Sequence, residues 1–237
     1  MSKPIYRRVI VKISGEALAG SRGFGIDDKA IDAIVADLVA CHKAGVQLGV
    51  VVGGGNLLRG SQLDAMKFSR PVSDSMGMMA TVMNALVLEE AIGRAGVSAR
   101  SMSALAMPQV CETYERRRAL RHFDENRIVL FGGGTGNPFF TTDTTAVLRA
   151  AEVGADAVLK ATNVDGVYDA DPKKSPGAKR YDKISHKEAI DKDLQVMDAT
   201  AFALARENRM PIIVFSIHEK GAIEAVLRGQ GRATIVG

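Results

Sequence analysis

The sequence predicts an α/β fold in which helices cover both faces of a mainly parallel β-sheet. Short apolar runs rich in β-branched residues alternate along the chain with longer segments whose apolar residues recur at helical spacing. Such alternation is typical of parallel strands that are joined by helices. No linker rich in Pro, Gly or Ser divides the 237 residues, so we expect one domain over 1–237.

The expected strands are the short apolar runs. In chain order they are Arg8–Ile13, Gln47–Val52, Val97–Met102, Arg127–Phe131, Ala157–Lys160, Pro211–Ile217 and Ala233–Val236. Val and Ile recur in these runs, and β-branched side chains favour the extended backbone of strands. The polar segment Asp169–Tyr181 contains two prolines and is therefore expected to be an exposed loop.

The clearest expected helix runs from Asp28 to Lys43. Asp27 and Asp28 stand at its start, while Lys43 and Gly45 mark a basic last turn and a glycine stop. Its apolar residues fall on one helical face, namely Ile31, Ile34, Val35, Leu38 and Val39. Similar spacing predicts helices over Ser73–Ala95, Glu112–Asn126, Thr144–Val153, Ser185–Lys192, Asp198–Asn208 and Glu219–Arg228.

Composition and charge exclude several classes of protein. The net charge is only +4, which is too weak to indicate nucleic acid but suits a small anionic ligand. No apolar run reaches the roughly 18 residues of a transmembrane helix, and the N-terminus lacks the layout of a signal peptide. Cys41 and Cys111 form no CxxC pair, so we expect free, partly buried thiols in a reducing cytoplasm. The scattered histidines predict no metal cluster but surface or capping roles for His42, His122, His186 and His218.

Glycines, hydroxyls and lysines gather where the expected strands end. The segments are Lys12–Glu16, Gly53–Asn56 followed by Arg59 and Gly60, Phe131–Ala146 and Lys160–Tyr168. Ligands of parallel sheets bind beyond the carboxyl ends of the strands. Glycine lets backbone N–H groups approach an anion, and lysine is a point charge suited to phosphate oxygens. Lys160 stands inside an apolar run, where an ammonium group needs an anionic partner. The sequence therefore predicts a site for one or more phosphates, reached by Lys12 and Lys160 from separate strands.

Purely structural explanations of these residues compete with the prediction of a phosphate site. A single Gly-Gly-Gly after a strand is usually a tight turn, but two such segments before helices favour a ligand site. The basic run Glu115–Arg121 is more typical of a solvated helix face than of a nucleic-acid contact. The methionine stripe Met76, Met78, Met79 and Met83 favours core or subunit-contact packing. The common phosphate signatures are missing, because no GxxxxGK[ST] occurs and Leu58 replaces the third glycine of GxGxxG.

Six motifs, in their order and spacing, resemble the bacterial uridylate kinases of the amino acid kinase family. They are KISGEAL, GGGNLLRG, DSMGMMATVMNAL, GTGNPFFTTD, KATNVDGVYDADP and QVMDATAFALA. GTGNPFFTTD is specific to UMP kinases, whereas KISGEAL and KATNVDGVYDADP are shared with carbamate, acetylglutamate and aspartate kinases. The resemblance covers the chain from about Tyr6 onward. It implies an open αβα sandwich with about eight strands, a homohexamer, and transfer of the γ-phosphoryl group of ATP to UMP in pyrimidine nucleotide biosynthesis.

The resemblance also implies which residues bind the two nucleotides, with the acceptor part mainly N-terminal and the ATP part mainly C-terminal. The implied ATP contacts are Lys12, Ile13, Ser14, Gly15, Gly55, Arg59, Thr162, Asn163, Tyr168 and Asp171. Arg59 could instead contact the UMP phosphate. The implied UMP contacts are Gly54, Asp74, Thr135, Gly136, Asn137, Pro138, Phe139, Phe140, Thr141 and Thr142. Gly54 is expected near the UMP phosphate, and Asp74 is expected to accept hydrogen bonds from the ribose.

The implied chemistry needs no general base, because UMP already carries an anionic phosphate oxygen. Lys12 and Lys160 are expected to stabilise charge on the transferred group, and Asp143 and Asp198 to hold these lysines. Mg²⁺ is expected to arrive with ATP, bound mainly by phosphate oxygens and water and by no protein ligand. The segment Gly20, Ser21, Arg22, Gly23, Phe24 and Gly25 matches the one linked in this family to activation by GTP. From its residues alone it is a flexible glycine loop with one arginine. UTP is the expected inhibitor.

Three alternatives to a UMP kinase follow from the same motifs. A kinase of the same fold that acts on a carboxylate or carbamate would share the glycine loops and lysines but lack GTGNPFFTTD. A Rossmann dehydrogenase would need the glycine that Leu58 replaces. A non-catalytic nucleotide sensor would keep the loops but could lose a lysine, and both lysines are present.

Overall fold

The computed structural model describes residues 3–58, 67–172, 174–175, 177–194, 196–219 and 221–237. Within them the strands form one nine-stranded sheet of order β4-β3-β5-β2-β1-β6-β8-β9-β7. All neighbouring strands are parallel except β8 and β9, which pair antiparallel. The strands are β1 Arg8–Ile13, β2 Gln47–Val52, β3 Ala99–Ser103, β4 Glu112–Thr113, β5 Ile128–Gly132, β6 Ala157–Thr162, β7 Lys183–Ile184, β8 Ile212–Ser216 and β9 Ala233–Val236.

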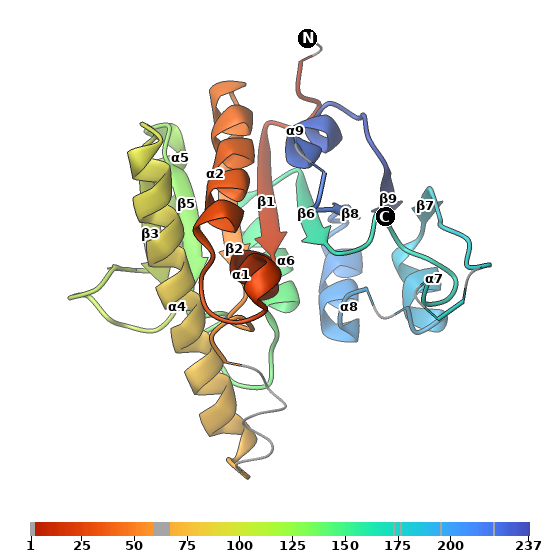
Figure 1. Cartoon of the computed structure of the whole chain (residues 1–237), viewed down its shortest axis with the longest axis horizontal. Helices are drawn as coiled ribbons and strands as arrows, with labels where there is room; N and C mark the ends of the chain where they lie inside the picture. Colours follow the sequence, from red (N-terminus) through yellow and green to blue (C-terminus); the bar gives the residue numbers. More distant parts are fainter. Residues whose placement is uncertain (1–2, 59–66, 173, 176, 195, 220) are drawn as a thin grey trace.

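Helices cover both faces of this sheet. They are α1 Gly15–Ala19, the 3₁₀ turn η1 Gly20–Arg22, α2 Asp28–Lys43, α4 Arg70–Arg94, α5 Arg116–Asp124, α6 Thr142–Val153, α7 His186–Asp191, α8 Ala199–Glu207 and α9 Ala222–Leu227. Figure 1 shows α2 and α4 side by side along the strands, with α4 continuing well beyond the edge of the sheet. None of the helices in the described residues is both long and apolar enough to cross a membrane.

The two faces of the sheet bury separate cores. Val9, Val11 and Ile13 of β1 pack with apolar residues of α2, α4 and α9. Ile10 of β1 and Val158 of β6 point the other way and pack with α5, α6, α7 and α8. This alternation along the strands decides on which face the polar side chains near the strand ends emerge.

The observed bounds of the strongly periodic elements agree with those predicted from the sequence, whereas the shortest elements were not predicted correctly. The predicted bounds of β1, β2 and α2 are those of the structure. The helix predicted over Glu112–Asn126 is wrong at its start, because Glu112 and Thr113 pair with β3 as strand β4. Helix α5 begins only at Arg116. The long helix α4 begins at Arg70, before the predicted Ser73, since Pro71 in its first turn favours helix initiation. Strand β7, of two residues, and helix α1, of five residues, were not predicted.

Candidate active site

Lys12 and Lys160 lie side by side on the neighbouring parallel strands β1 and β6. The strand register places their Cα atoms opposite each other. Because Ile10 and Val158, two residues earlier, face the α6 side of the sheet, both lysines also point there. Asp143 in the first turn of α6 meets them: its Oδ1 lies 2.9 Å from Nζ of Lys12 and its Oδ2 lies 2.5 Å from Nζ of Lys160.

These three side chains form a buried cluster with an excess of positive charge. Burial raises the pKa of Asp143, but the ammonium groups of Lys12 and Lys160 outweigh it and hold that pKa below its usual value. Burial lowers the pKa of Lys160, and the attraction of Asp143 opposes this shift. With all three groups ionised, the cluster carries one net positive charge at the carboxyl ends of two strands. Such a charge attracts an anionic group that can approach the two lysines.

Two glycine-rich loops meet beside this cluster. The N–H of Gly53, after β2, donates to the carbonyl of Ile13 at 2.9 Å. A Cβ atom on Gly15 would lie 2.6 Å from the backbone N of Gly55 and 2.8 Å from the carbonyl oxygen of Gly53. No side chain fits at Gly15, so the two loops can approach this closely only with glycine there. The result is a surface of bare backbone next to the lysines, suited to phosphate oxygens.

Two buried asparagines, which the sequence analysis did not assign to the site, hold the second glycine loop. Nδ2 of Asn84, on α4, donates to the carbonyl of Gly53 and to Oδ1 of Asn56, both at 2.7 Å. Nδ2 of Asn56 donates in turn to the carbonyl of Gly25 at 2.9 Å. Both asparagines are fully buried. Asn84 is a polar residue on a mostly apolar face of α4, and this pattern is the sequence signal that could have identified it.

A cavity of about 690 Å³ opens beside Lys12 and Lys160 and runs toward the loop after β6. It is lined by six of the predicted ATP contacts, namely Lys12, Ser14, Thr162, Asn163, Tyr168 and Asp171. Gly15 and Gly55 lie in the two touching loops, whereas the side chain of Ile13 is buried in the core. Arg59 lies outside the described residues. We refer to this space as the donor cavity.

The loop between β5 and α6 contains the predicted UMP contacts from Thr135 to Thr142. Its backbone N–H at Phe139 donates to Oδ2 of Asp74 at 2.7 Å, so the carboxylate predicted to bind ribose faces this loop. Phe139 adopts a φ of 75°, in the left-handed region that non-glycine residues seldom occupy. Its side chain is 57% exposed and that of Phe140 is 50% exposed. The loop is thus an open surface supported from α4.

The structure gives Asp198 a different set of partners from the one that the sequence suggested. Its carboxylate accepts hydrogen bonds from the hydroxyls of Thr141 and Thr144. It also caps α8 by accepting from the N–H of Ala201 at 2.9 Å. Among the interactions of the described residues, no hydrogen bond or ion pair joins Asp198 to either lysine; its charge acts on Lys160 only through space. Asp198 therefore joins the start of α6 to the start of α8, while Asp143 pairs with both lysines.

The segment Gly20–Gly25 follows α1 directly and contacts the loop after β2. Arg22, in η1, is exposed and pairs with Asp27 at 3.1 Å, and its guanidinium donates to the carbonyl of Ile26. A surface cavity of about 520 Å³ lies beside it, lined also by Lys29. The N–H of Gly25 donates to the carbonyl of Asn56 at 2.8 Å, which links this segment to the second glycine loop.

An open αβα sandwich with a lysine pair beside two glycine-containing segments, and without a GxxxxGK[ST] motif, differs from the P-loop class of proteins. Residues 7–216 match the profile of the Amino acid kinase family. A uridylate kinase of a Bradyrhizobium species is 62% identical over 236 residues, which cover 100% of this chain and 99% of that protein. A uridylate kinase of Rhodopseudomonas palustris is 61% identical over the same shares. The chain belongs to the amino acid kinase family, in its uridylate kinase branch.

Solved structures agree with this assignment. The UMP kinase of Bacillus anthracis superposes with a TM-score of 0.95 at 35% identity, covering 98% of this chain and 96% of that one. The UMP kinase of Ureaplasma parvum superposes with a TM-score of 0.94 at 36% identity, covering both chains completely. The predicted fold class is therefore confirmed.

Proposed function

We propose that the protein transfers the γ-phosphoryl group of ATP to UMP, giving UDP and ADP. The observation that carries this proposal is the pair of lysines, matched in register on β1 and β6 and tied to one carboxylate. The donor cavity lies on one side of them, and the GTGNPFFTTD loop follows β5, which is separated from β1 by β2 alone. The kinship with uridylate kinases supports UMP as the acceptor and pyrimidine nucleotide synthesis as the setting.

The reaction needs positioned charge rather than proton abstraction. An oxygen of the UMP phosphate attacks the γ-phosphorus, and a new P–O bond forms as the bond to the bridging oxygen of ADP breaks. ADP leaves with that electron pair. Lys12 and Lys160 neutralise the charge that spreads over the transferred group, and Asp143 keeps the two ammonium groups close despite their repulsion.

We propose Mg²⁺ as the ion that accompanies ATP, where it would neutralise phosphate charge. The described residues contain no group of three or more His, Cys, Asp or Glu side chains placed to hold a metal. The donor cavity does contain the hydroxyl of Ser14 and the carboxylate of Glu16, oxygen groups that suit the water shell of a hard cation. These residues fit an ion held mainly by phosphates and water.

Comparing UMP with CMP tests the proposal directly. The loop between β5 and α6, which we call the acceptor loop, offers backbone amides and Thr and Asn side chains. These groups can match the oxygen and N–H of uracil. CMP presents an amine where UMP presents an acceptor oxygen, and a hydrogen-bonded site rejects such an analogue by several orders of magnitude. A coupled assay of ADP release should therefore show strong preference for UMP. Equal turnover of the two would contradict the assignment of Thr135–Thr142, and no turnover of either would overturn the activity itself.

We further propose GTP as an activator that binds at Gly20–Gly25, and UTP as an inhibitor. Arg22 and Lys29 supply positive charge beside the surface cavity there. The bonds from Gly25 to Asn56, and from Asn84 to Gly53, form a continuous path from this segment to the glycine loop beside the lysines. A ligand that reorders the segment can therefore act on phosphate binding, which is the differential interaction that allostery requires.

We propose that the protein assembles as a homohexamer in the cytoplasm. Helix α4 carries an apolar stripe at helical spacing on which Val72, Met79 and Met83 are 50%, 45% and 55% exposed. An exposed stripe of this kind on a 25-residue helix is typical of a surface that packs against another chain. The free thiols of Cys41 and Cys111 are consistent with a reducing compartment. Sedimentation of the purified protein tests the assembly: a monomeric mass at micromolar concentration would contradict it.

A further inference from the structure

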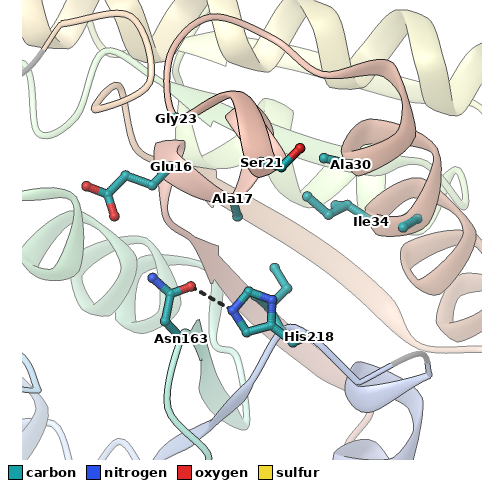
Figure 2. Close-up of a pocket in the computed structure, with 11 residues that line it drawn as sticks. Glu16, Ala17, Ser21, Gly23, Ala30, Ile34, Asn163 and His218 are labelled. Atoms are coloured by element: carbon teal, nitrogen blue, oxygen red, sulfur yellow. Dashed lines mark hydrogen bonds between the residues drawn. The ribbon is translucent and has the colours of Figure 1, made fainter. Parts of the chain in front are cut away.

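His218, predicted to be a surface or capping residue, contacts a residue of the donor cavity. It follows β8, and its Nε2 lies 3.1 Å from Oδ1 of Asn163 in the loop after β6. Figure 2 shows the imidazole and the amide facing each other in a second cavity, of about 800 Å³, which Glu16 and Ala17 also line. Asn163 lines both this second cavity and the donor cavity. Asn163 therefore separates the two cavities, and His218 contacts it from the side of the second cavity.

In the structure, the Asn163 amide turns its oxygen toward His218. An amide oxygen only accepts hydrogen bonds, so Nε2 of His218 must carry the hydrogen and donate it. The opposite amide orientation would set the NH₂ group against this N–H, two donors facing each other. Figure 2 shows the Asn163 nitrogen pointing away from His218. Within the described residues, that Nδ2 group makes no hydrogen bond, so its two N–H groups remain available to a ligand.

We infer that His218 is a positioning residue for the donor nucleotide, holding Asn163 as a hydrogen-bond donor toward ATP. This inference rests on the proposed function, which places ATP in the donor cavity. Because Oδ1 faces His218 and the two N–H groups of Nδ2 are left for a ligand, the ATP group that meets these N–H groups is an acceptor: a phosphate oxygen, a ribose oxygen or a ring nitrogen. The exocyclic amine of adenine is a donor and is not the partner. Asn163 thus contributes to the affinity for ATP without recognising the exocyclic amine of adenine.

The test compares His218→Leu with His218→Gln, because a glutamine amide can still donate where Nε2 does. Titration of ATP by calorimetry should show a dissociation constant raised roughly 3- to 10-fold in the leucine variant, the range for one lost neutral hydrogen bond. The glutamine variant should stay within about twofold of the parent protein. The dissociation constant of UMP should be unchanged in both. Since titration needs no turnover, its result stands even if UMP proves not to be the acceptor.

A double variant separates positioning from general damage. If His218 acts through Asn163, then adding His218→Leu to Asn163→Ala should weaken ATP no further. Asn163→Asp should weaken ATP although it keeps an acceptor for His218, because the carboxylate cannot donate. Three results would overturn the inference: ATP affinity unchanged in His218→Leu, additive losses in the double variant, or equal losses for ATP and UMP.

Discussion

The lysine cluster and the acceptor loop are built in opposite ways. Lys160 is 7% exposed, sits inside a central strand, and is fixed by strand register against Lys12. Phe139, by contrast, is 57% exposed and lies in a loop between β5 and α6. The cluster lies on two paired strands in the interior of the sheet, whereas the loop is held to α4 through a hydrogen bond to Asp74.

This difference assigns separate tasks to the two regions. Charge that is fixed before the reaction stabilises a transition state most, because no side chain then has to reorganise. Recognition of a nucleotide needs hydrogen-bonding groups that the ligand can reach, and these are found on exposed loops supported by a rigid frame. Damage to the cluster should therefore reduce turnover, and damage to the loop should reduce binding of UMP alone.

The largest expected effect is that of Lys160→Ala. Removing one group that stabilises charge in the transition state typically lowers kcat on the order of 10²–10³-fold. The Michaelis constants should change much less, because the lost interaction belongs to the transition state. Steady-state kinetics and the thermal midpoint should be measured on the same sample, with exposed Lys43→Ala as the control.

Lys160 also pairs with Asp143, so the variant separates a catalytic role from a structural one. If the ion pair only stabilises the fold, Lys160→Ala would melt earlier yet turn over normally while folded. A folded and fully active variant would end the two-lysine mechanism. It would also contradict the assignment of turnover to the lysine cluster and of UMP binding to the acceptor loop.

A smaller effect is expected for Asp74→Ala, on the other side of the comparison. Loss of a hydrogen bond to a charged group is worth about 1.5–3 kcal/mol, or roughly a 10- to 100-fold loss in UMP affinity. ATP affinity should change little, since Asp74 contacts the acceptor loop and does not line the donor cavity. Calorimetric titration with each nucleotide decides, with exposed Asp32→Ala as the control. An unchanged UMP affinity would show that Asp74 only supports the backbone of Phe139 without serving the ligand.

Arg22→Ala should have a still narrower effect, confined to activation. Arg22 lies in neither the lysine cluster nor the donor cavity, and it contacts Asp27 and the carbonyl of Ile26. We expect GTP activation to be lost while turnover without GTP stays near that of the parent enzyme. Initial rates over a GTP titration measure both quantities. A parallel fall in both would assign the segment to the active site instead.

Long periodic elements were predictable from the sequence, and so were the residue types at the strand ends. The bounds of α2 followed from five apolar residues at helical spacing with acids before them and a basic end after them. Strands β4 and β7 have two residues each, too few for any period to appear, and only their pairing with β3 and β9 defines them. Sequence patterns describe neighbours along the chain, and these short strands depend on neighbours in space.

The same limit applies to the candidate site. A lysine in an apolar run predicted a buried anionic partner for Lys160, but Asp143 and Asp198 were equal candidates by sequence. The register of β6 with β1 and the first turn of α6 select Asp143, while Asp198 is used by the hydroxyls of Thr141 and Thr144. The pairing of His218 with Asn163 joins residues 55 positions apart and had no sequence signal.

The smallest expected effect concerns acid stability, and it tests the charge of the cluster itself. Lys12 and Lys160 hold the pKa of Asp143 below its unfolded value of 3.8, although burial acts in the other direction. A carboxylate with a depressed folded pKa stabilises the protein at all pH values above the unfolded pKa. That stabilisation is lost as the pH falls through the folded pKa. The difference in Tm between the parent protein and Asp143→Asn should therefore stay constant from neutral pH down to about 4 and shrink only below it.

Exposed Asp32→Asn provides the matched control, because its Tm should follow that of the parent protein across the whole range. The difference in Tm between the parent protein and Asp143→Asn could instead disappear well above pH 4. In that case the effect of burial on the pKa of Asp143 outweighs that of the two lysines, and the carboxylate is protonated at a higher pH than expected. The cluster would then gain positive charge in mildly acidic solution, and ATP affinity measured over the same range should rise as the difference closes. If both quantities stay flat to pH 4, the carboxylate remains ionised. The single positive charge of the strand ends is then unchanged from neutral pH down to about 4.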